Sequence, residues 1–245
     1  MPYSRLSEID LARAMNVAAG PALEAEMRGY NAGFGPWSYK PIRESTADLV
    51  AAASPLLGPP PSVDWPHIAQ QILSACNRGQ KQIEANIKVS KILFDMARDC
   101  GWLAVHETMG HLSVGFGEYV RYWCDIVLAD ANGPFIPFFD HRRGRGLTNP
   151  DVMRIVFSMQ HIGVRERNPD LSNARLAIIR FPAAGLDRSI SLHFHDESDL
   201  LTYEDLDTRV RDVYATWAKV CDERAAEKKH SAGGRDFVLA KRTGP

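Results

Sequence analysis

The chain has 245 residues, of which 45% are hydrophobic and 24% are charged, so it carries ample apolar material for a folded core. Lysine and arginine number 29 against 30 aspartate and glutamate residues, which gives a formal net charge of −1 at pH 7. This balance excludes a globally basic protein, so any contact with nucleic acid has to come from a local patch.

The cysteines and the apolar runs point to a cytoplasmic protein. The four cysteines are far apart and form no CxxC pair, which favours reduced thiols over a disulfide framework. Residues 1–13 lack an apolar core of signal-peptide length, and no run of about 18 apolar residues exists to span a bilayer. We therefore expect no contact with a membrane.

The first fifty residues read as short helices separated by breakers. Ser7 followed by Asp10 is typical of a helix start, and the alanine-rich run that follows reaches Gly20. Pro21 opens a second helix that Gly29 ends. Residues 30–45 mix aromatic residues, glycine and proline without a period, which predicts an ordered loop, and a brief helix follows over 46–53.

The strongest breaker of the chain is the run Gly58-Pro59-Pro60-Pro61. We place a boundary there. The prediction is a helical N-terminal extension over residues 1–57, a core domain over 62–230 and a flexible tail over 231–245.

Two helices and a strand follow the breaker. Asp64 is a candidate cap for a helix with Pro66 in its first turn that reaches about Arg78. The next helix, predicted over residues 80–100, has one broad apolar side and one charged side. Gly101 ends it, and residues 102–106 read as a short strand.

The stretch from Tyr119 to Thr148 has the pattern of a β-hairpin. Two runs rich in β-branched and aromatic residues flank the turn signal at residues 131–134. Asp125 lies in the first run, and the second ends with Asp140 and Arg142 on the face that also carries Phe138. An acid and a base at the end of an apolar strand cost desolvation energy unless they are paired or solvated.

The last hundred residues alternate helix and strand. Asn149 and Pro150 mark a helix start, residues 175–181 form a continuous apolar strand, and residues 189–195 alternate as a second strand. Thr202 with Asp205 predicts a final helix to about Lys229. A seam suited to another helix or a second subunit, and hence to a homodimer, recurs along it at Leu206, Val210, Val213, Trp217 and Val220.

The order of elements predicts an α/β fold. A mixed β-sheet of about five strands is expected, flanked by helices in an α-β-β-β-α-β-like core, with a helical N-terminal extension and a long C-terminal helix.

From Gln80 to His195 this order, with its two acids, resembles the core of the PD-(D/E)XK phosphodiesterase superfamily, which includes many nucleases. The resemblance implies that Asp125 matches the second-strand acid and that Asp140-His141-Arg142 matches the third-strand motif, with arginine in place of lysine. Glu84 matches the acid on the first helix. The two aspartates would hold Mg²⁺ or Mn²⁺ through oxygen, and Arg142 would stabilise phosphate charge.

Each of these residues has a structural alternative. Asp140 with Arg142 also suits an ion pair that orders the following loop, and Asp125 also suits an exposed strand edge. Glu84 lies four residues before Lys88, where a surface pair explains it.

A basic turn follows the second strand of the hairpin. Arg142, Arg143 and Arg145 stand beside glycines that let backbone amides approach a phosphate, so they are candidate nucleic-acid contacts, although solvated basic loops are common. His193 and His195 have the spacing of a transition-metal chelate, with an exposed strand end as the alternative.

These features support two main hypotheses. The first is a metal-dependent nuclease, with Asp125 and Asp140 as ligands, Arg142 on phosphate and Glu84 as a helper. The second is a non-catalytic α/β module, related to nucleases or not, that binds nucleic acid or a protein through the basic turn and the final helix. A third is a metal enzyme built on His193 and His195.

Overall fold

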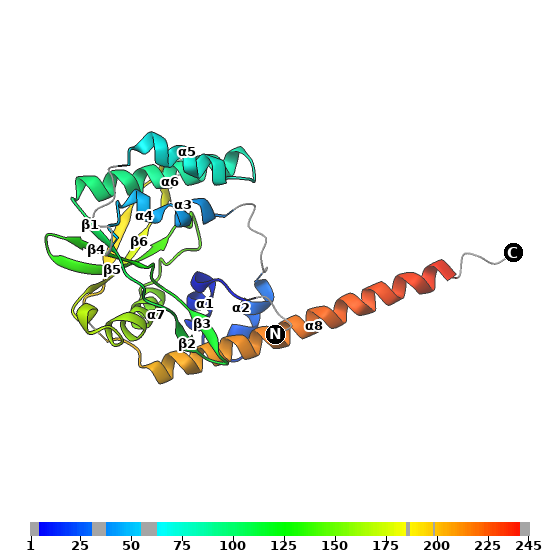
Figure 1. The fold of residues 1–245 in the computed structure, drawn as a ribbon. Helices are drawn as coiled ribbons and strands as arrows, with labels where there is room; N and C mark the ends of the chain where they lie inside the picture. Colours follow the sequence, from blue (N-terminus) through cyan, green and yellow to red (C-terminus); the bar gives the residue numbers. More distant parts are fainter. Residues whose placement is uncertain (1–4, 31–37, 55–62, 185–186, 198, 241–245) are drawn as a thin grey trace.

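A computed structural model describes residues 5–30, 38–54, 63–184, 187–197 and 199–240 of the chain (Figure 1). The helices, in chain order, are α1 (Glu8–Met15), α2 (Pro21–Gly29), α3 (Lys40–Glu44), α4 (Thr46–Leu49), α5 (Trp65–Ala75), α6 (Gln80–Asp99), α7 (Pro150–Gln160), the π-helix η1 (His161–Arg165), the 3-10 helix η2 (Pro169–Leu171) and α8 (Tyr203–Ala240). The strands are β1 (Leu103–His106), β2 (Leu112–Val114), β3 (Glu118–Val120), β4 (Ile126–Asp130), β5 (Gly133–Asp140), β6 (Arg175–Arg180), β7 (Ala183–Ala184), β8 (Asp187–Arg188) and β9 (Ser191–Phe194).

A five-stranded mixed sheet forms the centre of the molecule, in the order β1-β4-β5-β6-β9. The pair β5–β6 is parallel, and the other neighbours are antiparallel. The predicted hairpin is β4–β5, with Asp130 paired to Gly133 across the turn. The α/β fold class with a mixed five-stranded sheet is therefore confirmed.

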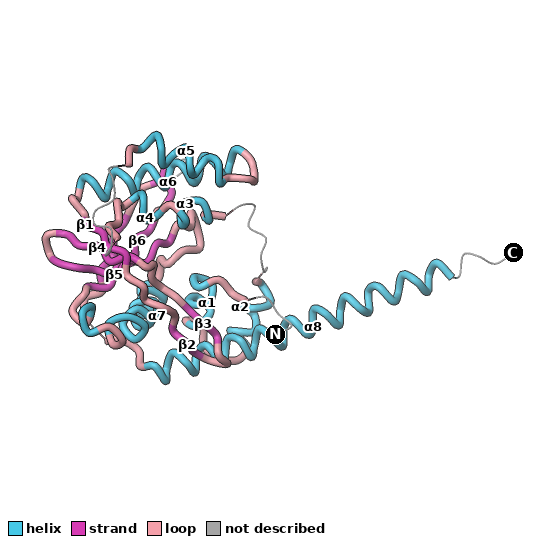
Figure 2. Tube along the Cα trace, viewed as in Figure 1, coloured by secondary structure: helices cyan, strands magenta, loops and turns pink. Residues whose placement is uncertain are grey.

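Helices cover both faces of this sheet (Figures 1 and 2). Phe135 and Phe139 of β5 pack into a core with the apolar sides of α3 to α6, while Ile136 between them packs into a second core with α1, α7 and α8. Successive side chains of a strand point to opposite faces of the sheet, so each central strand contributes side chains to both cores.

The helix starts follow from capping side chains. Ser7, Asp64 and Asn149 each accept a hydrogen bond from a backbone amide in the first turn of α1, α5 and α7 respectively. Pro150 occupies the first helical position of α7, where its missing N–H costs nothing. These three starts are confirmed.

Helix α8 is the longest element, and its later turns project away from the body of the molecule (Figure 1). The seam predicted along it is buried within this chain, with its residues at most 1% exposed. Helix α8 packs chiefly against α1, α2 and β2. The seam is therefore not available for the predicted homodimer, because the N-terminal helices already occupy it.

Some local predictions differ from the structure. Strand β2 lies within residues 110–117, whose sequence predicts a loop between the strand over 102–106 and the hairpin. Helix α3 lies within the predicted loop over 30–45, of which residues 31–37 are outside the described part. Helix α8 runs to Ala240, past the predicted end near Lys229. The domain boundaries stay a prediction, and the Gly58–Pro61 breaker lies outside the described residues.

Two further expectations concern cysteines and membranes. The cysteines Cys76, Cys100, Cys124 and Cys221 are free thiols. Among the described residues, no helix has the length and apolar content needed to cross a bilayer.

Candidate functional site

The side chain of Asp140 contacts the loop that follows β5. Its side chain is 1% exposed, and its two carboxylate oxygens accept hydrogen bonds from the backbone amides of Arg142 at 3.1 Å and Leu147 at 2.6 Å. A Cβ added at Gly146 would lie 2.2 Å from Oδ2 of Asp140, so only glycine leaves room for this carboxylate. The observed contacts of Asp140 are those of a residue that orders a loop.

Arg142 binds the N-terminal helix. Its guanidinium donates to the two oxygens of Asp10 at 2.6 and 2.8 Å and to the hydroxyl of Ser7 at 2.7 Å. Burial by itself raises the pKa of Asp10, but the hydrogen bonds and charge of Arg142 outweigh burial and lower that pKa. Tyr30 also donates to Asp10, at 3.3 Å. We call Ser7, Asp10, Tyr30 and Arg142 the Arg142 network.

Asp125 stands just before β4 and has a different set of partners. It pairs with Arg121 and accepts from the backbone amide of Met109 at 3.1 Å, and its side chain is 41% exposed. Burial is the largest single effect and raises the pKa of Asp125, but Arg121, the Met109 amide and the charge of His111 together outweigh it and lower that pKa. The neighbouring strands therefore do not join Asp125, Asp140 and Arg142 into one polar group.

Glu84 is exposed on α6 and accepts a hydrogen bond from Gln80 at 3.0 Å. Helix α6 packs on the face of the sheet that carries Phe139, whereas the side chain of Asp140, one residue along the strand, points to the other face. The sheet thus lies between Glu84 and Asp140. Lys88, the surface partner expected for Glu84, forms an ion pair with Asp187 at 3.1 Å.

The basic turn is exposed at Arg143 and Arg145. Arg145 adopts a positive φ of 55°, an uncommon conformation for a residue other than glycine. The third arginine of the turn, Arg142, points inward to Asp10, so the three do not form one exposed cluster.

Within the described part of the chain, no group of three or more histidine, cysteine, aspartate or glutamate side chains could hold a metal ion. His195 accepts a hydrogen bond at Nδ1 from the amide of Glu197 at 3.1 Å and packs on Phe157 at 5.2 Å between ring centres. His193 lies 3.2 Å from the hydroxyl of Ser191. Both histidines thus have partners within β9 and its C-terminal end.

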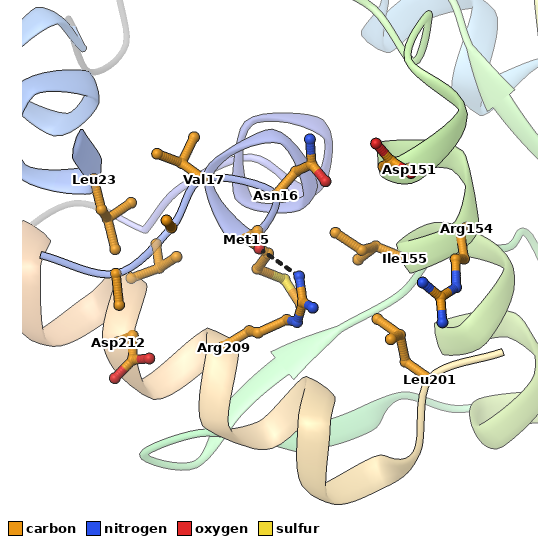
Figure 3. Close-up of a pocket in the computed structure, with 13 residues that line it drawn as sticks. Met15, Asn16, Val17, Leu23, Asp151, Arg154, Ile155, Leu201, Arg209 and Asp212 are labelled. Atoms are coloured by element: carbon orange, nitrogen blue, oxygen red, sulfur yellow. Dashed lines mark hydrogen bonds between the residues drawn. The ribbon is translucent and has the colours of Figure 1, made fainter. Parts of the chain in front are cut away.

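A cavity lies between the turn that joins α1 to α2, the first turns of α7, and α8 (Figure 3). Its volume is about 460 Å³. The buried apolar side chains along it are Met15, Leu23, Ile155, Leu201 and Val213. The polar side chains along it are Asn16, Asp151, Arg154, Arg209 and Asp212. We call it the α1–α8 cavity.

Two arginines of the α1–α8 cavity have different surroundings. Arg154 forms an ion pair with the carboxylate of Asp199 and a hydrogen bond to its carbonyl. Arg209 donates from Nη1 to the carbonyl of Met15 at 3.0 Å, at the C-terminal end of α1 (Figure 3). Sequence reasoning missed this site because its lining comes from three segments that lie far apart in the chain.

A second surface feature is a group of exposed aromatic side chains on the β2–β3 hairpin and the start of α8. Phe116, Tyr119 and Tyr203 are 55%, 58% and 40% exposed, and Tyr203 ties the two elements together by donating to the carbonyl of Ser113 at 3.1 Å. We call these three residues the hairpin patch. Aromatic residues are enriched at protein interfaces, because they bury large areas at low entropic cost.

Comparison with known proteins identifies relatives along nearly the whole chain. Residues 9–227 match the family model described as "Sliding clamp-binding bacterial toxin SocB". The chain is 31% identical over 235 residues to the DNA replication inhibitor toxin SocB of Caulobacter vibrioides (strain NA1000 / CB15N), and the alignment covers 96% of this chain and 97% of that protein. No solved structure matches the chain.

These matches correct the functional predictions. The PD-(D/E)XK resemblance is wrong, because it rested on the order of elements and two acids, whereas the family match runs from α1 into α8. The nuclease function and nucleic acid as the main partner are wrong with it, since the matching family is described as binding a sliding clamp, which is a protein. The alternative of a protein-binding module agrees better with these relatives. Binding of Mg²⁺ or Mn²⁺ by Asp125 and Asp140 stays a prediction without support from the family.

Proposed function

This chain belongs to the SocB family of sliding clamp-binding bacterial toxins, and from this premise we propose that it binds the sliding clamp of its own bacterium and inhibits DNA replication. The observation that carries the proposal is the extent of the similarity. The alignment covers 96% of this chain and 97% of its relative, so it includes both helical layers and the sheet.

The structure supports binding rather than hydrolysis. Asp140 and Arg142 are engaged with the loop after β5 and with α1, where they hold elements together. The hairpin patch displays three aromatic side chains to solvent, which is a feature of surfaces that bind proteins. We infer that the chain acts by occupying its partner, and that it does so in the cytoplasm, where replication takes place.

The direct test is binding of the purified full-length chain to the purified clamp. Gel filtration and calorimetry are expected to show a complex with a defined stoichiometry. The matched control is the same titration with bovine serum albumin in place of the clamp. The absence of a complex at concentrations of about 10 μM would contradict the proposal, since a specific interface binds more tightly than this.

Inhibition is tested by primer extension on a circular single-stranded template with a reconstituted replicase. The chain is expected to reduce the length of the products when the clamp is required for extension. It is expected to have no effect on a polymerase that extends the same primer without a clamp. Equal inhibition in both reactions would argue against the clamp as the target.

A further inference from the structure

We propose that the α1–α8 cavity binds a small molecule that carries a short aliphatic group and a single carboxylate. This inference does not depend on clamp binding. It rests on the size of the cavity, its apolar walls and the hydrogen bonding of the Arg209 guanidinium.

The size and walls suit a small ligand. The volume of about 460 Å³ falls in the range of about 300–1,000 Å³ that is typical of small-molecule sites. Met15, Leu23, Ile155 and Val213 are each at most 2% exposed, so they form a packed backing that keeps its shape behind the more open apolar lining of Val17, Ala18 and Ala19. An aliphatic group placed against them is removed from water, which favours binding.

Arg209 supplies the polar contact. Its Nη1 donates to the carbonyl of Met15 at 3.0 Å, which fixes the position of the guanidinium at the end of α1 (Figure 3). Within the described part of the chain, neither Nε nor Nη2 of Arg209 has a hydrogen-bond partner. Nε and Nη2 form the edge of a guanidinium that binds a carboxylate through two parallel hydrogen bonds, and this edge of Arg209 has no partner among the described residues.

The other charged groups limit the ligand to one negative charge. Arg154 is already neutralised by Asp199, so it offers little attraction for a second anionic group. The exposed carboxylates of Asp151 and Asp212 lie at opposite sides of the cavity (Figure 3). A dianion such as a phosphate monoester would meet both carboxylates with only Arg209 to offset them, and like charges repel. A monocarboxylate bound at Arg209 leaves the fewest unpaired charges.

The structural role of Arg209 is the alternative to a binding role. A cation near the C-terminal end of a helix stabilises that helix, and the bond from Arg209 to Met15 provides this for α1. That role uses one N–H of the guanidinium. It explains neither the cavity nor the Nε and Nη2 groups that have no partner among the described residues.

The experiment follows the side-chain methyl groups of the full-length chain by NMR during a titration with 4-methylpentanoate. We expect saturable shifts of the methyl groups of Ile155 and Leu201, with about millimolar affinity for so small a probe. The matched amine, 4-methylpentylamine, and the matched phosphate, 3-methylbutyl phosphate, are expected to bind at least about tenfold more weakly. An amine that binds as well as the carboxylate, or shifts that do not saturate, would overturn the proposal.

Variants separate binding from structure. Arg209→Gln is expected to weaken binding of 4-methylpentanoate at least about tenfold, whereas Arg211→Gln, on the same helix but outside the cavity lining, is expected to leave it unchanged. If Arg209→Gln fails to fold, Ala18→Trp at the exposed rim fills the cavity and leaves Arg209 in place, with Ala22→Trp outside the lining as its control. Unchanged binding to folded Arg209→Gln, or to Ala18→Trp, would refute the site.

Discussion

At the scale of single residues, Asp125 and Asp140 show how two similar acids at strand ends acquire different energetic roles. Asp140 is buried and accepts hydrogen bonds from two backbone amides, of which that of Leu147 is buried as well. Asp125 is 41% exposed and pairs with Arg121 at the surface, where an ion pair contributes little to stability. The burial of each carboxylate decides how much it contributes to the stability of the folded protein.

We therefore expect Asp140→Asn to lower the free energy of unfolding by about 1–3 kcal/mol. The asparagine side chain has one acceptor oxygen fewer than the aspartate side chain, so one buried backbone N–H is left without a partner. Asp125→Asn is the matched control and is expected to cost less than about 1 kcal/mol. Urea denaturation of the two variants measures both values. Equal costs would show that Asp140 is not the structural acid that its contacts indicate.

His141 presents a second effect of burial. Its ring stacks on Phe181 with 5.4 Å between ring centres and a 3° angle between planes, and Tyr39 and Phe139 lie against it as well. Burial, together with the charges of Arg43 and Arg188, lowers the pKa of His141 from 6.5 to about 3. The histidine is therefore neutral in the folded protein at pH values well above 3.

This pKa shift predicts a loss of stability in acid. Below pH 6.5 the unfolded chain binds a proton at His141 that the folded chain does not bind until about pH 3, so the free energy of unfolding falls as the pH drops through this window. Between pH 6.5 and about pH 5 the contribution is about 2 kcal/mol.

The test replaces His141 with phenylalanine, which keeps an aromatic ring and cannot titrate. Urea denaturation at neutral pH and at about pH 5 gives the decrease in the free energy of unfolding between the two pH values. We expect this decrease to be about 2 kcal/mol smaller for His141→Phe than for the natural chain. His67→Gln, at an exposed position of α5, serves as the control. A natural chain and a His141→Phe variant with the same pH dependence would contradict the prediction.

At the scale of elements, the Arg142 network ties α1 to the loop after β5. The Arg142 and Asp10 side chains are only 27% and 16% exposed, so their ion pair is better shielded from water than an ordinary surface pair. The network joins the N-terminal helix to the end of a central strand, although more than a hundred residues separate them in the chain.

Asp10→Asn is expected to destabilise the protein by about 1–3 kcal/mol, because it leaves the guanidinium of Arg142 partly buried without its counter-charge. Amide hydrogen exchange is expected to speed up more in α1 than in α7, since the network anchors α1 directly. Glu8→Gln, in the same first turn, is the control and is expected to cost less than about 1 kcal/mol. Exchange that speeds up equally in α1 and α7 would show that the network has no local anchoring role.

At the scale of the whole molecule, the proposed function predicts that the degree of inhibition depends on the fraction of clamp molecules bound by the chain. A chain that blocks replication by binding the clamp acts in proportion to its amount, whereas a nuclease turns over many substrates. Family membership favours the first behaviour.

We expect the concentration of chain needed for half-inhibition of primer extension to rise in proportion to the clamp concentration when binding is tight. Supercoiled plasmid incubated with the same chain and Mg²⁺ is expected to remain intact. Inhibition that excess clamp does not relieve, or a plasmid that is cut, would contradict binding as the mechanism.

Much of the fold could be predicted from local patterns. The caps at Ser7, Asp64 and Asn149 and the apolar strand Arg175–Arg180 depend on neighbouring residues, so the sequence shows them directly. Strand β2 was missed, because three residues between glycine-rich turns give too short a period to detect. Local patterns could not predict the α1–α8 cavity, since its walls come from α1, α2, α7 and α8 together.

By itself the sequence determined the types of most elements, the α/β class and the presence of an acid and a base, Asp140 and Arg142, at the end of β5. Only the tertiary structure decided what those groups contact: α1 provides Asp10 for Arg142, and the N-terminal helices cover the seam of α8. The physical reason is that periodicity and capping act over a few residues, whereas burial and pairing depend on segments that meet only when the chain has folded.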